Sequence, residues 1–263
     1  FVVLVIVIRT PWAQNFIVNK AVAFISNKTN TTVAIKKLFI TFDGNVQLDG
    51  LYLEDVKGDT LVYSKSLEAN VPLWAMIRGK GIGVDALYWD GLRANIIRKD
   101  SISGYNFQFL IDAFASKDTL TVAKDSTKPL NIVLGKFRFK NMDIVFDDAV
   151  VGIVSRFKIG ALKANLETTN LENMIFEASK LELANSNIKF IQKPIPINSK
   201  EEASQLPTLA VNKLKLENVV AYYKSYSDNT VASVNINDFY AEIPKANLGS
   251  STFEMGAVRL KKS

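Results

Sequence analysis

The chain has 263 residues, of which 48% are hydrophobic, and it contains no Cys and no His. This composition excludes a disordered chain, disulfides, thiol nucleophiles, zinc sites built on Cys or His, and histidine acid–base catalysis. The net charge is +6, but Lys and Arg are spread along the chain, which disfavours nucleic acid as a partner and fits a mild attraction to an anionic membrane surface.

The first eight residues are all apolar, and Arg9, Thr10, Pro11 and Trp12 follow them. Eight residues rise only about 12 Å as a helix, whereas the bilayer core is roughly 30 Å thick, so this run cannot span a membrane alone. It is either a buried N-terminal strand or, as we favour, it belongs to the end of a transmembrane anchor, which covers residues 1–11. The anchor hypothesis assigns to the membrane and its interface Phe1, Val2, Val3, Leu4, Val5, Ile6, Val7, Ile8 and Trp12.

Residues 12–30 show helical spacing, because apolar side chains recur three and four residues apart. The recurring residues are Trp12, Phe16, Ile17, Ala21, Phe24 and Ile25. The pattern predicts an amphipathic helix that packs on the core, covers the edge of the first strand, or does both.

From residue 31 the apolar period becomes two, which predicts strands. Helical spacing returns briefly at 105–115, and polar or Pro-containing stretches separate the strand-rich parts. In chain order we predict a first β unit at 31–115 with a short helix at 105–115, a linker at 116–129, a second unit at 130–192, a loop at 193–207, and a third unit at 208–263, with the chain continuing beyond it.

The second and third units are copies of each other. Residues 134–186 align without a gap on residues 211–263, so that Phe139 falls on Leu216 and Asn141 falls on Asn218. Repeated strand units bury their apolar face by adding neighbours. We therefore predict three units of about five strands each in one long array.

The sequence offers no catalytic site. Acidic residues occur as neighbours, as at Asp147 and Asp148, and adjacent strand residues point to opposite faces, so such pairs do not converge on a substrate. There is no GxSxG elbow and no phosphate loop. We predict that the protein is not an enzyme and uses no cofactor and no metal.

An antiparallel sheet with one apolar face must hide that face. We predict a mainly β fold, a repeating antiparallel β-groove whose sheet curls like a taco, with an apolar interior suited to acyl chains. The predicted groove lining is Leu38, Ile40, Phe42, Ile82, Val84, Phe137, Phe139, Ile144, Phe146, Leu162, Leu166, Leu181, Leu183, Leu214, Leu216, Phe239, Ile243, Val258 and Leu260.

Several segments resemble a known family. Residues 9–35 (RTPWAQNFIVNKAVAFISNKTNTTVAI) resemble the start of TamB-like proteins of diderm bacteria, in which a short helix follows an inner-membrane anchor. Residues 48–71, 79–100 and 103–114 resemble the strands that follow in TamB and the wider AsmA-like group. The group's turn ending in Asp, followed by a Gly-Asn-Phe-type segment, is matched by Asp100, Gly104, Asn106 and Phe107.

The resemblance implies a single-pass inner-membrane protein with most of its chain in the periplasm, which conducts phospholipids along a hydrophobic β-groove toward the outer membrane. It also implies an outer-membrane partner of the BamA or TamA type, reached through a C-terminal region outside this sequence. The alternative is a scaffold or chaperone of the translocation and assembly module, which assists the insertion of outer-membrane proteins by strand pairing at an open edge.

Overall fold

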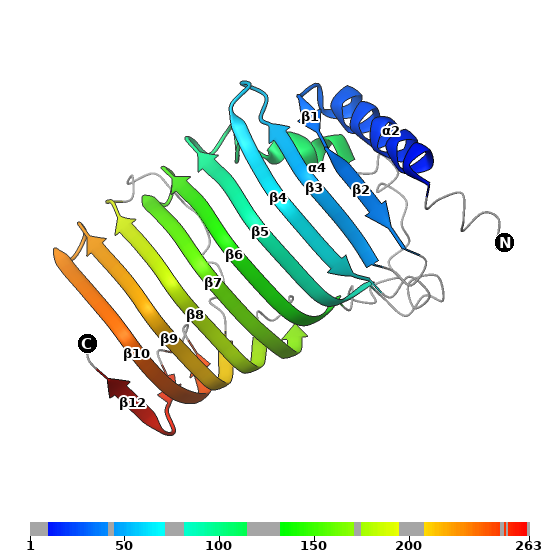
Figure 1. The fold of residues 1–263 in the computed structure, drawn as a ribbon. Coiled ribbons are helices and arrows are strands. Elements are labelled where there is room, and N and C mark those ends of the chain that lie inside the picture. Colours follow the sequence, from blue (N-terminus) through cyan, green and yellow to red (C-terminus); the bar gives the residue numbers. More distant parts are fainter. Residues whose placement is uncertain are drawn as a thin grey trace, which may run out of the picture.

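The protein is mainly β in a computed structural model, and its described residues form one long sheet and two helices (Figure 1). The structure describes residues 10–41, 45–71, 82–114, 132–170, 175–194, 208–247, 250 and 252–261. The helices are α2 (Pro11–Thr29) and α4 (Gln108–Phe114). The strands are β1 (Val33–Ala34), β2 (Lys37–Ile40), β3 (Asn45–Glu54), β4 (Thr60–Asn70), β5 (Ile82–Arg98), β6 (Ile132–Asp148), β7 (Ile153–Asn170), β8 (Ile175–Gln192), β9 (Thr208–Ser225), β10 (Thr230–Asn247), β11 (Thr252–Glu254) and β12 (Val258–Lys261).

The strands lie side by side nearly in chain order. The path runs β1-β3-β4-β5-β6-β7-β8-β9-β10-β11, while β2 pairs with β3 and β12 pairs with β10. The two edges of the sheet do not pair with each other within the described residues. The sheet is therefore open, and it grows along the chain by the addition of strands.

The sequence repeat is a repeat of structure. Strands β6, β7 and β8 form one meander, and β9, β10 and the pair β11 and β12 occupy the equivalent places in the next. Val258 pairs with Ala241 just as Leu181, at the equivalent position of the previous copy, pairs with Ala164. The unit has three long strands of 17 or 18 residues, rather than about five, because each strand bends at its middle without ending there.

The sheet is mixed, which corrects the antiparallel fold predicted from the sequence. The pairs β5–β6 and β8–β9 are parallel, and the other neighbours are antiparallel. A meander of three strands begins and ends in the same direction. The first strand of the next copy repeats that direction, so it must run parallel to the last strand of the copy before it.

A line of kinks crosses the sheet at the middle of the strands. It is marked by residues with left-handed backbone, at φ angles between 49° and 70°, and we call these residues the kink line. They are Gly50, Gly91, Asn141, Asn185 and Asn218. Only Gly, and to a lesser degree Asn and Asp, adopts this conformation at low cost. This explains why Asn141 and Asn218 coincide in the sequence repeat.

The kink line shifts the side-chain alternation by one residue in each strand without changing the pairing register. The β9–β10 pairing, for example, has the same register before and after Asn218. Asn218 Nδ2 donates to Asn185 Oδ1 at 3.1 Å, and Asn141 Nδ2 donates to Asp90 Oδ1 at 2.7 Å. A left-handed residue inside a strand turns the backbone locally, and in Figure 1 the long strands bend so that one end of each curves behind the sheet.

We expect Asn218→Val to lower the free energy of unfolding by about 2 kcal/mol. A β-branched residue at a φ of 51° is strained by about 1–2 kcal/mol, and the hydrogen bond to Asn185 is lost as well. Asn218→Gly loses only that hydrogen bond and should cost about half as much or less. Urea unfolding of the two variants measures both losses of unfolding free energy. Equal losses would show that the left-handed backbone is not what selects Asn here.

Helix α2 lies along the first edge of the sheet, against β1 and β2 (Figure 1). It begins at Pro11, where Thr10 Oγ1 accepts a hydrogen bond from Ala13 N at 3.3 Å, and it ends before Asn30, at a φ of 54°. The face that packs is not the predicted one. Its buried residues are Ala13, Gln14, Val18 and Thr29, none of which carries an aromatic ring, so the helix can approach a strand edge closely.

Among the described helices none combines the length and the apolar character needed to cross a membrane. The predicted anchor residues Phe1 to Ile8 lie outside the described residues, as do the predicted linker at 116–129 and most of the predicted loop at 193–207.

The first parallel junction, between β5 and β6, ends in a buried ion pair. Asp148 is 1% exposed and accepts hydrogen bonds from Arg98 Nε at 2.9 Å, from the Tyr105 hydroxyl at 2.7 Å, and from the N–H groups of Val150 and Val151. The carboxylate of Asp148 thus supports the fold at this junction.

Candidate functional site

One face of the sheet carries three rows of apolar side chains, in which each residue is the direct cross-strand partner of the next. We call them the three apolar rows. The first row is Leu38, Leu48, Leu67, Trp89, Phe139, Leu162, Leu183, Leu216, Phe239 and Leu260. The second row is Ile40, Val46, Ala69, Leu87, Phe137, Ala164, Leu181, Leu214, Ala241 and Val258. The third row is Val33, Leu53, Val62, Ala94, Ile144, Phe157, Ile188, Ala221 and Val234.

The kink line keeps all three rows on one face. Phe139 and Ile144 are an odd number of residues apart, so an uninterrupted strand would place them on opposite faces. The left-handed backbone at Asn141 reverses the alternation between them. The apolar residues on both sides of the kink line therefore share one face from one edge of the sheet to the other.

The rows pack laterally but lack a covering layer among the described elements. Leu92, Ala94 and Met142 form a buried cluster, against which Trp89 and Phe139 pack with their rings edge to face at 6.3 Å. Contacts between described elements join only sheet neighbours and the two helices, and α2 reaches only β1, β2 and α4. The larger side chains of the rows remain half-buried, apart from exposed ones toward the last edge.

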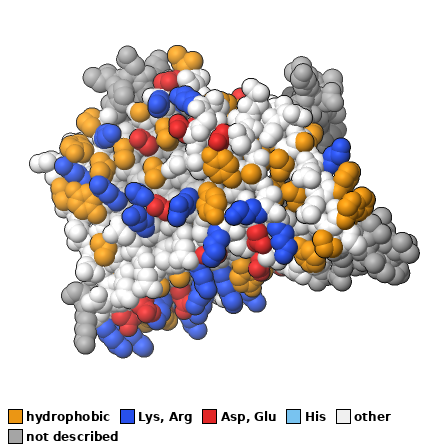
Figure 2. Space-filling model, turned by 45° about the horizontal axis from the view of Figure 1, so that its top comes forward, with side chains coloured by type: hydrophobic (Ala, Val, Ile, Leu, Met, Phe, Trp, Pro, Cys, Tyr) orange, Lys and Arg blue, Asp and Glu red, His pale blue; other side chains and the backbone are white. Residues whose placement is uncertain are grey.

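The opposite face is polar and charged. Its row beside the first apolar row contains Gln47, Glu68, Tyr88, Arg138, Lys163, Glu182, Lys215, Tyr240 and Arg259. Lys163 Nζ lies 3.5 Å from Glu182 Oε2 across two strands. Figure 2 shows Lys and Arg interspersed with Asp and Glu over one face of the molecule. Exposed ion pairs of this kind add little stability, but they keep a sheet face in water.

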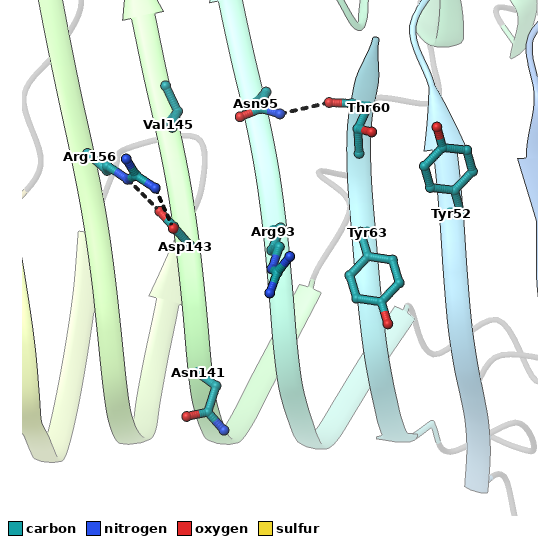
Figure 3. Close-up of a pocket in the computed structure, with 9 residues that line it drawn as sticks. All are labelled: Tyr52, Thr60, Tyr63, Arg93, Asn95, Asn141, Asp143, Val145 and Arg156. Carbon is teal, nitrogen blue, oxygen red and sulfur yellow. Dashed lines mark hydrogen bonds and ion pairs between the residues drawn. The ribbon is translucent and has the colours of Figure 1, made fainter. Parts of the chain in front are cut away.

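A hollow of about 680 Å³ lies on the charged face, across β3 to β7 (Figure 3). Its lining is Tyr52, Thr60, Tyr63, Arg93, Asn95, Asn141, Asp143, Val145 and Arg156. Arg156 donates to both carboxylate oxygens of Asp143, at 2.8 and 2.7 Å. These hydrogen bonds outweigh burial and hold the pKa of Asp143 below its ordinary value. The carboxylate is a structural ion-pair partner and is not poised to accept a proton near neutral pH.

Most of the predicted lining residues lie in the three apolar rows. The structure places in these rows Leu38, Ile40, Phe137, Phe139, Ile144, Leu162, Leu181, Leu183, Leu214, Leu216, Phe239, Val258 and Leu260. Phe146, Leu166 and Ile243 lie beyond the rows but on the same face, because each is an even number of residues from a row member on its own strand.

Three predicted residues do not join them. Val84 lies outside the three rows, where it pairs with Leu134 near the start of β5 and β6. Phe42 and the side chain of Ile82 lie outside the described residues.

The sequence prediction missed part of each row, among them Leu48, Leu67, Trp89 and Ile188. Two of the missed residues, Leu48 and Trp89, begin a recognisable pattern, an apolar residue followed by any residue, then Gly or Asn, then another apolar residue. It occurs at 48–51 (LDGL), 89–92 (WDGL), 139–142 (FKNM) and 216–219 (LENV). Each occurrence places the kink line between apolar residues of one face.

What this site offers chemically is a continuous apolar surface beside a face of mutually paired charges. Such a surface can cover apolar ligands, and its aliphatic and aromatic side chains supply no nucleophile, acid or base. A scan against models of known protein families gives no match to this chain, and no curated protein matches it.

Proposed function

We propose that the three apolar rows conduct phospholipid acyl chains, and that the protein is a periplasmic bridge, anchored in the inner membrane, which carries phospholipids toward the outer membrane. The observation that carries this proposal is the continuity of the rows. Each described strand from β3 to β10 contributes an apolar residue to every row.

The continuity of the rows matters because exposing an acyl chain to water costs free energy. Each methylene transferred to water costs about 0.8 kcal/mol, so a lipid that moves between membranes needs apolar cover at each step. Strands lie about 4.8 Å apart, and ten of them make a path on the order of 40 Å long. One polar residue in a row would expose several methylenes at once.

The curvature supports a groove. Ala241 in the second row is 0% exposed, and Ala164 is 8% exposed, although no described element covers them. Side chains on the concave side of a bent sheet crowd one another, and this buries the small ones. We infer that the bend along the kink line makes the apolar face the interior of a repeating β-groove, with one side left open for lipid headgroups in water.

One observation favours the second function, a scaffold that assists the insertion of outer-membrane proteins. Strand β10 pairs with β12 only through residues 238–241 and with β11 only through residues 245–247. Residues 230–236 therefore have no strand partner on that side among the described residues. An unpaired edge can add a client strand by main-chain hydrogen bonds.

Photo-crosslinking separates the two functions. A benzoylphenylalanine at Leu162, in the first row, should form phospholipid adducts when the full chain is mixed with phospholipid vesicles, and mass spectrometry detects them. The same group at Lys163, one residue away on the charged face, is the matched control. Equal adducts at both positions would contradict the groove, and protein adducts at Ser233 on the open edge, without lipid adducts at Leu162, would favour the scaffold.

A further inference from the structure

Helix α2 presents an aromatic surface that nothing in the described structure covers. Trp12, Phe16 and Phe24 are 73%, 53% and 59% exposed. On α4, Ile111 and Phe114 are exposed too, and the rings of Phe24 and Phe114 are 6.1 Å apart. We call these five residues, together with Lys20 and Lys28, the α2 surface. A patch of this size marks an interaction site rather than chance exposure.

The charge of the α2 surface is mainly positive. Lys20 Nζ lies 5.6 Å from the centre of the Phe16 ring, and Lys28 Nζ lies 4.7 Å from that of Phe114. Helix α2 contains no Asp and no Glu. Asp112 is the single acidic residue of α4, and it accepts a hydrogen bond from Gln108 at 3.0 Å.

We infer that the α2 surface docks onto the headgroup region of an anionic phospholipid membrane. Aromatic rings favour the level of the headgroups, and lysines reach past them toward phosphate. The exposed face alternates rings and lysines with Asn15, Asn19 and Asn27, a mixture that suits a wet interface better than a dry protein pocket. In the sequence, an all-apolar run at residues 1–8 comes shortly before this helix.

The inference that the α2 surface docks on a membrane does not depend on whether the apolar rows carry lipid. If the rows do carry lipid, the docking has one consequence. Helix α2 packs against β1 and β2, where the rows begin with Val33, Leu38 and Ile40. A helix that lies flat on the membrane would hold this end of the groove at the lipid surface, and this consequence rests on the proposed function.

The absence of Cys from the sequence permits a site-specific test on the full chain. Asn19→Cys puts a single environment-sensitive fluorophore on the exposed face of α2, and Ser233→Cys puts the same label on exposed β10 as the control. Vesicles of phosphatidylcholine alone are compared with vesicles that also contain phosphatidylglycerol. We expect the label at residue 19 to shift to the blue with anionic vesicles, and the label at residue 233 to stay unchanged.

Two further variants separate charge from apolar contact. The pair Lys20→Gln and Lys28→Gln should weaken the response to anionic vesicles about fivefold per lysine, equivalent to ~1 kcal/mol each. The pair Phe16→Ser and Phe24→Ser should abolish the blue shift. Protein that sediments with anionic vesicles while its label at residue 19 remains in water would overturn the inference. So would a shift that appears with rising protein concentration in the absence of vesicles, since the surface would then join two copies of the chain.

Discussion

Ile188→Asp should lower the phospholipid bound by the full chain more than tenfold, because an ionised carboxylate under an acyl chain must keep water or take up a proton at a cost of several kcal/mol. Ile188 lies within the third row, between Phe157 and Ala221. Its side chain is half-buried without lipid, so the free energy of unfolding should fall by only about 1–2 kcal/mol. Co-purified lipid, counted by mass spectrometry at equal protein amounts, measures the first effect, and urea unfolding measures the second.

Asn187→Asp is the matched control for this variant. It creates the same carboxylate one residue away, on the charged face, where the cross-strand partner on β7 is Lys158. Lipid binding and stability should both stay near those of the unchanged protein. If Ile188→Asp retains as much lipid as Asn187→Asp, the rows are not the lipid path, and the open edge of β10 becomes the better candidate site.

The alternation of apolar residues was sufficient to predict the β class and part of the membership of the rows, but not how the strands join. Phe137, Phe139, Ile144 and Phe146 are recognisable as inward residues because strand alternation survives on either side of Asn141. The same Asn makes one long strand resemble two short ones, since polar residues also mark turns. A left-handed φ can be accommodated within a strand or used to end it, and spacing alone does not distinguish the two.

Strand direction could have been deduced from the repeat once its strands were counted correctly. An odd number of strands per copy forces a parallel junction, whereas an even number permits an antiparallel one. Neither parity nor direction is visible in a composition or in a single strand.

The sequence could not predict which face of α2 packs on the sheet, for a different reason. Trp12, Phe16 and Phe24 have the spacing of a core-facing stripe, and such residues usually point inward. Which face packs depends on the shape of the surface that receives the helix, here the edge formed by β1 and β2. A narrow strand edge accepts Ala13 and Val18 and leaves the large rings outside.

The largest loss of stability should come from Arg98→Met, about 3–5 kcal/mol, because it leaves the carboxylate of Asp148 buried without its cation. Side-chain exposure is 14% for Arg98 and 1% for Asp148, and Arg98 also stacks on Tyr105 at 4.8 Å. The second parallel junction pairs Gln192 with Ser225 at the equivalent place, so the ion pair is particular to the first. Lys65→Met is the matched control, since it removes the cation of an exposed pair with Asp90 and should change stability little.

The pH dependence of Arg98→Met distinguishes a lost ion pair from lost packing. Burial alone would raise the pKa of Asp148, but hydrogen bonds from Arg98, Tyr105, Val151 and Val150 together hold that pKa below its ordinary value. The stability that this carboxylate contributes is therefore present above the ordinary Asp pKa and is lost as pH falls through the lowered one.

Without Arg98, fewer hydrogen bonds oppose the effect of burial on the pKa of Asp148, so Asp148 should take up a proton at a higher pH than in the unchanged protein. The destabilisation by Arg98→Met should then be largest near neutral pH and shrink as pH approaches about 4. Urea unfolding across this range measures the difference, and a loss of stability that is independent of pH would assign the effect of Arg98 to its packing on Tyr105.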